Sequence, residues 1–131
     1  MSFIFSSTLI VLVMLLHIYF LILEMFLWTK PLGLKTFRQS PADAEKSKAL
    51  AANQGLYNGF LAAGLAWGLL HGNSELGMQI RIYFLCCIII AGLYGAYSVS
   101  KRILFVQALP ALIALIALFG EFYFSFLYSH N

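Results

Sequence analysis

The chain has 131 residues, of which 62% are hydrophobic and only 10% are charged. Soluble domains carry about 25% charged residues, so this composition excludes a water-soluble protein and indicates an integral membrane domain. The net charge of +3 comes without a basic patch that interleaves with aromatic residues, and nucleic acid is therefore not predicted as a partner.

Four apolar segments reach the length of about 20 residues that a bilayer-spanning helix needs. We predict helices at about 3–28, 41–71, 77–100 and 103–128. The last two connections are short, and short connections force neighbouring helices to run antiparallel. The predicted fold class is therefore an all-α membrane protein, a four-helix up-down-up-down transmembrane bundle in which residues 1–131 form a single domain.

The connection at 29–47 is the longest polar segment of the chain. Ser40, Pro41 and Asp43 predict a helix start, with serine as the N-cap, proline at the first helical position and a carboxylate in the first turn. Pro31, Gly33 and Phe37 predict that the rest of this connection is an ordered or interfacial loop.

Basic residues are unevenly distributed between the two ends of the predicted bundle. Seven lie on one side and only Arg81 lies toward the other. By the positive-inside rule, loop 29–47 is predicted to be cytoplasmic and both termini to face outward, in a bacterial inner (plasma) membrane. The seven are Lys30, Lys35, Arg38, Lys46, Lys48, Lys101 and Arg102.

Polar side chains concentrate in the cytoplasmic half of all four predicted helices. The outer halves are apolar apart from His71 and Glu121, which lie near the helix ends, where they can reach water. This convergence predicts a cavity open to, or just beneath, the cytoplasmic interface, with the lipid bilayer as its surroundings. The predicted ligand-binding residues are Glu24, His17, Asn53, Gln54, Tyr57, Asn58, Tyr94 and Gln107.

Glu24 and His17 are the candidate catalytic residues, because an ionisable group inside a membrane is costly and must face the bundle interior, pair or take up a proton. The alternative for Glu24 is that it snorkels to the interface or pairs with Lys30 or Lys48. The alternative for His17 is a neutral ring hydrogen-bonded across helices. The sequence has neither an HExxH motif nor a paired Cys-His spacing, so no metal site is predicted.

Small residues recur every four positions at Gly55, Gly59 and Ala63. Positions four apart share one helix face, and such a face lets neighbouring helices approach closely in a membrane. The contact lies either within one bundle or between protomers, which leaves a homo-oligomer open. The carboxamides beside this stripe serve equally well as interhelical hydrogen-bonding groups.

Four motifs carry a resemblance that spans essentially the whole chain. They are LEMFLW at 23–28, NQGLYNGF at 53–60, AGLYGA at 91–96 and VQALPA at 106–111. With them the sequence resembles a family of small bacterial and fungal integral membrane proteins catalogued as a domain of unknown function. The resemblance implies a compact four-helix membrane protein and no established activity.

Several functions are compatible with this pattern. The first is the binding of an amphipathic or apolar small molecule, such as a lipid or a quinone-like compound, whose polar head meets the cytoplasmic-half residues. The alternative is a membrane-embedded isomerase or oxidoreductase, with Glu24 as acid/base and a tyrosine or His17 as its partner. A structural subunit and a small proton-coupled exporter are further alternatives, although the strong charge bias argues against an exporter that inserts in both orientations. Whether the protein is an enzyme, and whether it uses a cofactor, stays open.

Overall fold

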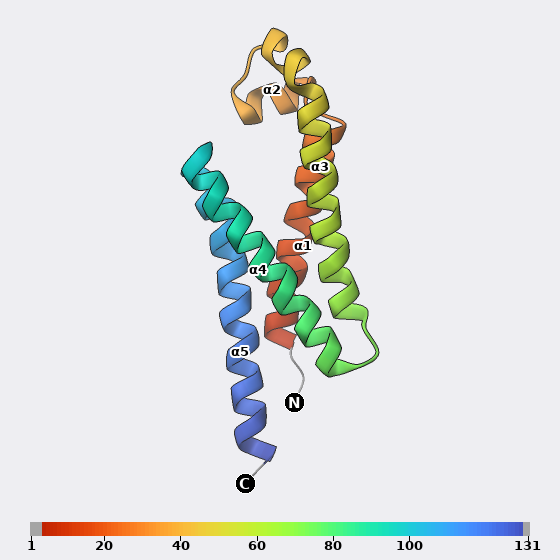
Figure 1. The fold of residues 1–131 in the computed structure, drawn as a ribbon, viewed down its shortest axis with the longest axis vertical. Coiled ribbons are helices and arrows are strands. Elements are labelled where there is room, and N and C mark those ends of the chain that lie inside the picture. The colour runs from red at the N-terminus through yellow and green to blue at the C-terminus, as the bar shows by residue number, and fades with distance from the viewer. Residues whose placement is uncertain (1–3, 130–131) are drawn as a thin grey trace. The chain divides into compact units, whose positions relative to one another are not determined.

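The computed structural model describes residues 4–129 (Figure 1). All regular structure in this part of the chain is helical, as the sequence predicts. The elements are α1 (Ile4–Met25), α2 (Pro31–Phe37), α3 (Pro41–Leu70), α4 (Ser74–Ser98), the π-helical segment η1 (Leu104–Ala108) and α5 (Leu109–Ser129).

The helix starts follow local capping chemistry. The predicted start at Pro41 is confirmed, because the Ser40 hydroxyl accepts a hydrogen bond from the Asp43 main-chain nitrogen at 3.1 Å. α4 begins three residues earlier than predicted, because Asn73 caps it. The Asn73 side chain accepts hydrogen bonds from the main-chain nitrogens of Glu75 and Leu76, both at 3.0 Å, and so satisfies two of the four free donors of that helix end.

Three helical stretches of the described chain are long and apolar enough to cross a membrane. They are Ile4–Met25, Ser74–Ser98 and Leu104–Tyr128. α3, which the sequence analysis predicts as a further span, is 30 residues long but is not among them. Its three carboxamides and its glycines lower its hydropathy, so a fourth span stays a prediction.

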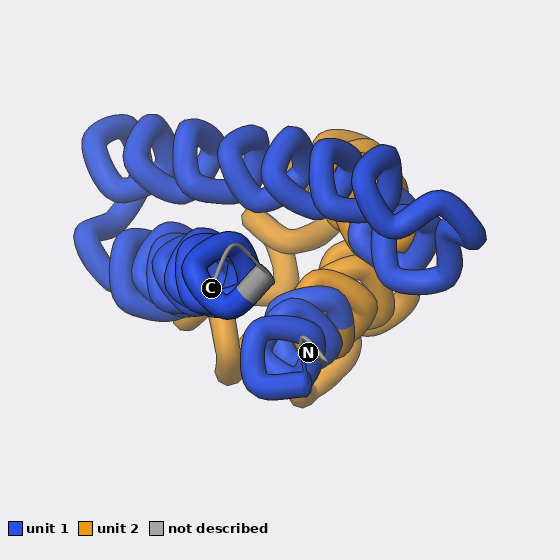
Figure 2. The backbone as a smooth tube through the Cα atoms, turned by 90° about the horizontal axis from the view of Figure 1, so that it is seen from below, with its two compact units in different colours: residues 1–14, 64–131 blue, residues 15–63 orange. Residues whose placement is uncertain are grey.

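The chain divides into two compact units (Figure 2). Unit 1 contains residues 1–14 and 64–131, and unit 2 contains residues 15–63. Unit 1 therefore holds the first part of α1, the end of α3, and all of α4, η1 and α5. Unit 2 holds the rest of α1, α2 and most of α3.

Within unit 1, α4 packs against η1 and α5. At Gly92 of α4 the two backbones almost touch, since a Cβ atom there would lie 2.8 Å from both the Cβ and the main-chain nitrogen of Ala108. The main-chain N–H of Leu109 bonds to the Leu104 oxygen five residues back, which is the π-helical pattern. Pro110 follows directly, and a proline ring crowds the preceding turn and donates no hydrogen bond. The π-helical turn at 104–108 is wider than an α-helical turn, and it lies where the Pro110 ring needs space.

Glu121 has a partner that the sequence analysis did not anticipate. Its two carboxylate oxygens accept hydrogen bonds from the main-chain nitrogens of Phe5 and Ser6, at 3.2 and 3.3 Å, and from the Ser6 hydroxyl. These nitrogens lie in the first turn of α1, whose free donors and positive dipole end favour an anion. Arg81 is 8% exposed, donates from Nε to the Gly77 oxygen at 3.0 Å and attracts Glu121 electrostatically. Glu121 therefore ties α5 to the start of α1 within unit 1.

Replacing Glu121 with glutamine is expected to destabilise the protein by about 1 kcal/mol. The amide has one acceptor oxygen in place of two and no charge to offer the helix end. Thermal unfolding in mild detergent measures the effect. Glu45→Gln, which changes an exposed carboxylate, is the matched control. Equal midpoints for Glu121→Gln and the wild type would contradict a capping role.

Candidate functional site

The candidate site is a hydrogen-bonded pair in unit 2, formed by Glu24 of α1 and Asn58 of α3. Asn58 Nδ2 donates to Glu24 Oε2 at 2.7 Å and to the main-chain oxygen of Gln54 at 3.3 Å. Asn58 is 5% exposed, and Glu24 is half-buried. The structure thus pairs Glu24 with Asn58, another of the predicted ligand-binding residues. Lys48, an alternative partner, forms its ion pair with Glu45.

Two glycines of α3 let α1 and α3 approach closely, so that the short Asn58 side chain reaches Glu24. A Cβ atom at Gly55 would lie 3.1 Å from the Glu24 Cβ, the Leu21 oxygen and the Met25 nitrogen. A Cβ atom at Gly59 would lie 2.5 Å from the Leu21 Cδ1. Gly55 and Gly59 therefore face α1, and the close approach of the two backbones positions the carboxyl group beside the carboxamide.

The Glu24–Asn58 pair can accept further hydrogen bonds. Asn58 directs its amide nitrogen at two acceptors, and Glu24 uses one oxygen. Among the described residues, no hydrogen bond occupies Glu24 Oε1 or Asn58 Oδ1. Two acceptor oxygens of different helices thus remain for a hydroxyl or another donor. The described residues contain no group of three or more His, Cys, Asp or Glu that could hold a metal ion.

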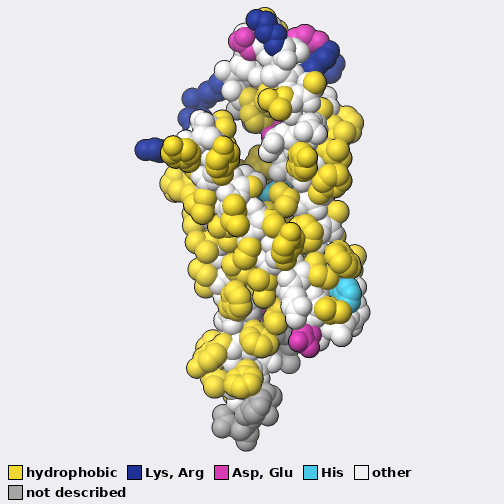
Figure 3. All heavy atoms as spheres, in the orientation of Figure 1, with side chains coloured by type: hydrophobic (Ala, Val, Ile, Leu, Met, Phe, Trp, Pro, Cys, Tyr) yellow, Lys and Arg dark blue, Asp and Glu magenta, His cyan; other side chains and the backbone are white. Residues whose placement is uncertain are grey.

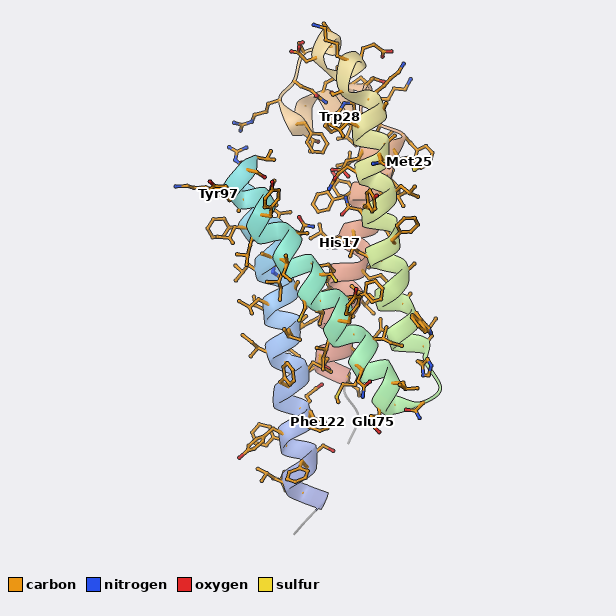
Figure 4. All side chains as sticks on the ribbon, in the orientation of Figure 1. His17, Met25, Trp28, Glu75, Tyr97 and Phe122 are labelled. Carbon is orange, nitrogen blue, oxygen red and sulfur yellow. The ribbon has the colours of Figure 1, made fainter. Side chains whose placement is uncertain are left out.

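His17 lies on α1 seven residues before Glu24, on the same helix face. It is fully buried, and its ring meets that of Phe20 edge-on at a centroid distance of 6.1 Å. Figure 4 labels His17 and Met25, two residues of α1. The burial of His17 fits a ring packed inside the protein, and its role at the site stays a prediction.

The remaining predicted site residues have different surroundings. In unit 2, the side chains of Asn53, Gln54 and Tyr57 are exposed, and the Tyr57 ring packs edge-on against Phe60 at 5.9 Å. In unit 1, Tyr94 is exposed on α4 and Gln107 is half-buried on η1. The structure thus joins Glu24, Asn58 and the Gln54 main chain, and it leaves the binding roles of the other residues as predictions.

Sequence reasoning missed the support that α2 gives to the end of α1. The Trp28 indole donates to the Ser47 hydroxyl at 3.1 Å, and its ring packs on Phe37 at a centroid distance of 4.5 Å. Gly33 of α2 lies against the main chain of Leu27 and Trp28. The available signal was a glycine and an aromatic residue spaced four apart, Gly33 and Phe37, shortly after an apolar segment and its tryptophan, Trp28. This packing fixes the chain immediately after Glu24.

Comparisons with known proteins cover every candidate residue. The sequence model of a protein family, described as "Protein of unknown function (DUF1304)", matches residues 11–119. The "Uncharacterized protein YpaA" of Lactococcus lactis subsp. lactis (strain IL1403) is 31% identical over 103 residues, which are 77% of this chain and 85% of the relative. No solved structure matches the chain.

Proposed function

Since the chain belongs to the DUF1304 family of unknown function, we propose its function from its own site: it binds an amphipathic or apolar small molecule in the membrane. The single observation that carries this proposal is the hydrogen bond of 2.7 Å between Glu24 and Asn58. The ligand is lipid-like or quinone-like, and its polar head meets these two side chains.

The cost of the pair supports a role beyond packing. A charged side chain in a membrane helix costs about 2.5–3.5 kcal/mol at the helix centre and less toward the helix ends, and an apolar residue at position 24 avoids this cost. Interhelical hydrogen bonds in membranes return only about 0.6 kcal/mol on average. The association of α1 with α3 therefore does not by itself account for a carboxyl group at position 24. The two acceptor oxygens favour a head group that carries a hydroxyl, as a quinol or a lipid alcohol does.

The proposal includes the arrangement of the chain in the membrane. α3 crosses as a fourth span from about residue 49, so that a single four-helix domain runs up-down-up-down. The connection at 29–47 is cytoplasmic, because seven of the eight basic residues lie on its side of the predicted bundle. Glu24, one residue before the last residue of α1, then lies at the cytoplasmic end of this helix, where a lipophilic molecule enters sideways from the leaflet.

Native mass spectra of the protein released from mild detergent test the binding. The wild type is expected to carry a defined extra mass, and Glu24→Gln is expected to reduce its occupancy about tenfold, as the loss of one hydrogen bond to a charged group does. Glutamine still accepts the hydrogen bond from Asn58, so the helix contact survives while the carboxyl group is lost.

Glu75→Gln is the matched control, because Glu75 is an exposed acid in the first turn of α4. It should leave the extra mass unchanged. Bare protein from both the wild type and Glu24→Gln, with identical thermal stability, would remove the support for a ligand site. The pair would then act as interhelical hydrogen bonding alone, and the search would move to protein partners.

A further inference from the structure

The short helix α2 has the composition of a segment that rests on a membrane surface. Its position is fixed by Trp28 and Phe37, whose rings pack together, while Leu32 stays 47% exposed. Phe26, in the turn before it, is 63% exposed. Interfacial helices combine such exposed apolar side chains with Lys and Arg, and Lys35 supplies a cation within α2 itself.

The charges around α2 are not balanced locally. Five cations stand against Asp43 and Glu45 in this part of unit 2. Asp43 accepts a hydrogen bond from the Ser40 hydroxyl at 2.7 Å in the cap of α3, and Glu45 pairs with Lys48. Lys and Arg side chains gather over α2 and the first turns of α3 (Figure 3). Four exposed cations have no ion pair within residues 4–129: Lys30, Lys35, Arg38 and Lys46.

Arg38 occupies a backbone position that arginine does not favour. It ends α2 in the left-handed conformation, with φ 53° and ψ 45°, and its N–H bonds to the Leu34 oxygen. Within the described residues it is the only non-glycine residue with a positive φ. Glycine or asparagine adopts this conformation at lower cost, and strained residues that persist tend to serve a function. The strained position presents a guanidinium group, which binds phosphate with two parallel hydrogen bonds.

We propose that α2 and the first turns of α3 bind the headgroups of anionic phospholipids. Lys35 and Arg38 contact the phosphates, and Leu32 enters the apolar layer beneath them. The four uncompensated cations match the negative surface of a cytoplasmic leaflet. This site is separate from the Glu24–Asn58 pair and does not depend on it.

Quenching of Trp28 fluorescence by brominated lipids tests the proposal. The chain has two tryptophans, so Trp67→Phe leaves Trp28, which packs on α2, as the sole reporter. The protein is placed in vesicles that contain phosphatidylcholine and phosphatidylglycerol, with one of the two lipids brominated at a time. We expect an apparent preference of about fivefold for phosphatidylglycerol, the value for one basic residue at an anionic surface.

Three variants locate the preference. Lys35→Gln combined with Arg38→Gln should abolish it, whereas Lys101→Gln combined with Arg102→Gln removes the same charge elsewhere and should leave it intact. Arg38→Gly should weaken the preference while relaxing the backbone, so this variant keeps the test valid if the double variant unfolds.

Equal quenching by the two lipids in the wild type would overturn the proposal and leave the cations for an acidic protein segment. An unchanged preference in both the double variant and Arg38→Gly would also overturn it. An equal loss in the Lys101→Gln/Arg102→Gln control would show that net charge, and not α2, sets the preference.

Discussion

Gly33→Ala is expected to detach α2 from the end of α1 and to destabilise the protein by about 3 kcal/mol, the upper end of the usual cost of overpacking. The new Cβ would lie 2.1 Å from the Leu27 oxygen and 2.7 Å from the Trp28 oxygen. Both atoms belong to the main chain, so no side-chain rotation relieves the contact. The helix must move, and the packing of Trp28 on Phe37 is lost with it. Thermal unfolding in detergent and the Trp28 emission maximum measure the two effects.

Gly120→Ala is the matched control for this variant. Gly120 lies inside α5 with no atom within 4 Å of the added Cβ. Alanine is favoured over glycine in a helix by about 1 kcal/mol, so this control should hold or raise the unfolding midpoint. A Gly33→Ala protein that unfolds at the wild-type temperature would contradict the close approach of α2 to residues 27–28.

Gly92→Ala is expected to separate α4 from η1 and to cost about 2–3 kcal/mol. The added Cβ would lie 2.8 Å from the Ala108 Cβ and nitrogen, and 3.0 Å from its Cα. Adding Ala108→Gly removes one of these three contacts and leaves the two main-chain ones, so the double variant should recover only part of the loss. Unfolding midpoints of the single and double variants in one detergent give the comparison.

Gly95→Ala is the comparison variant for Gly92→Ala. Its Cβ would approach the Ile103 side chain at 3.0 Å, and a side chain can move where a main chain cannot. A smaller loss than at Gly92 is therefore expected. Equal losses at the two positions would show that helix spacing, and not the contact with the Ala108 main chain, controls stability.

Much of the fold follows from local sequence signals. Apolar length predicts α1, α4 and α5, and the Ser40–Asp43 cap predicts the first residue of α3. The resemblance carried by the four motifs is confirmed by the family match. These features depend on residues near one another in the chain, which a single sequence displays directly.

Other features depend on contacts between distant residues or on competing local effects. Glu121 was predicted to reach water, but its hydrogen-bond partners lie 115 and 116 residues away. Pro31, Gly33 and Phe37 were assigned to an ordered or interfacial loop, but they lie in the short helix α2, where Gly33 contacts the main chain of residues 27–28. The widened turn at 104–108 depends on the Pro110 ring that follows it and on the contact of Ala108 with Gly92 of α4, which lies 16 residues earlier in the chain.

The candidate site was predictable in part. Depth placed Glu24 and the carboxamides near one end of the bundle, and four-residue spacing assigned Gly55 and Gly59 to a packing face. Which carboxamide meets the carboxyl group depends on the rotation of α3 about its axis. The rotation places Asn58 toward α1, with 5% of its surface exposed, and leaves Asn53 and Gln54 exposed.

The Glu121 contact also sets an order of events during synthesis. The first turn of α1 leaves the ribosome before its carboxylate partner, which follows 115 residues later. At about 5–20 residues per second, Glu121 is made about 6–23 seconds after the main-chain donors that it binds. Water, lipid headgroups or the insertion machinery must satisfy these donors in the interval, so the first turn of α1 acquires these native contacts only after Glu121 has been made.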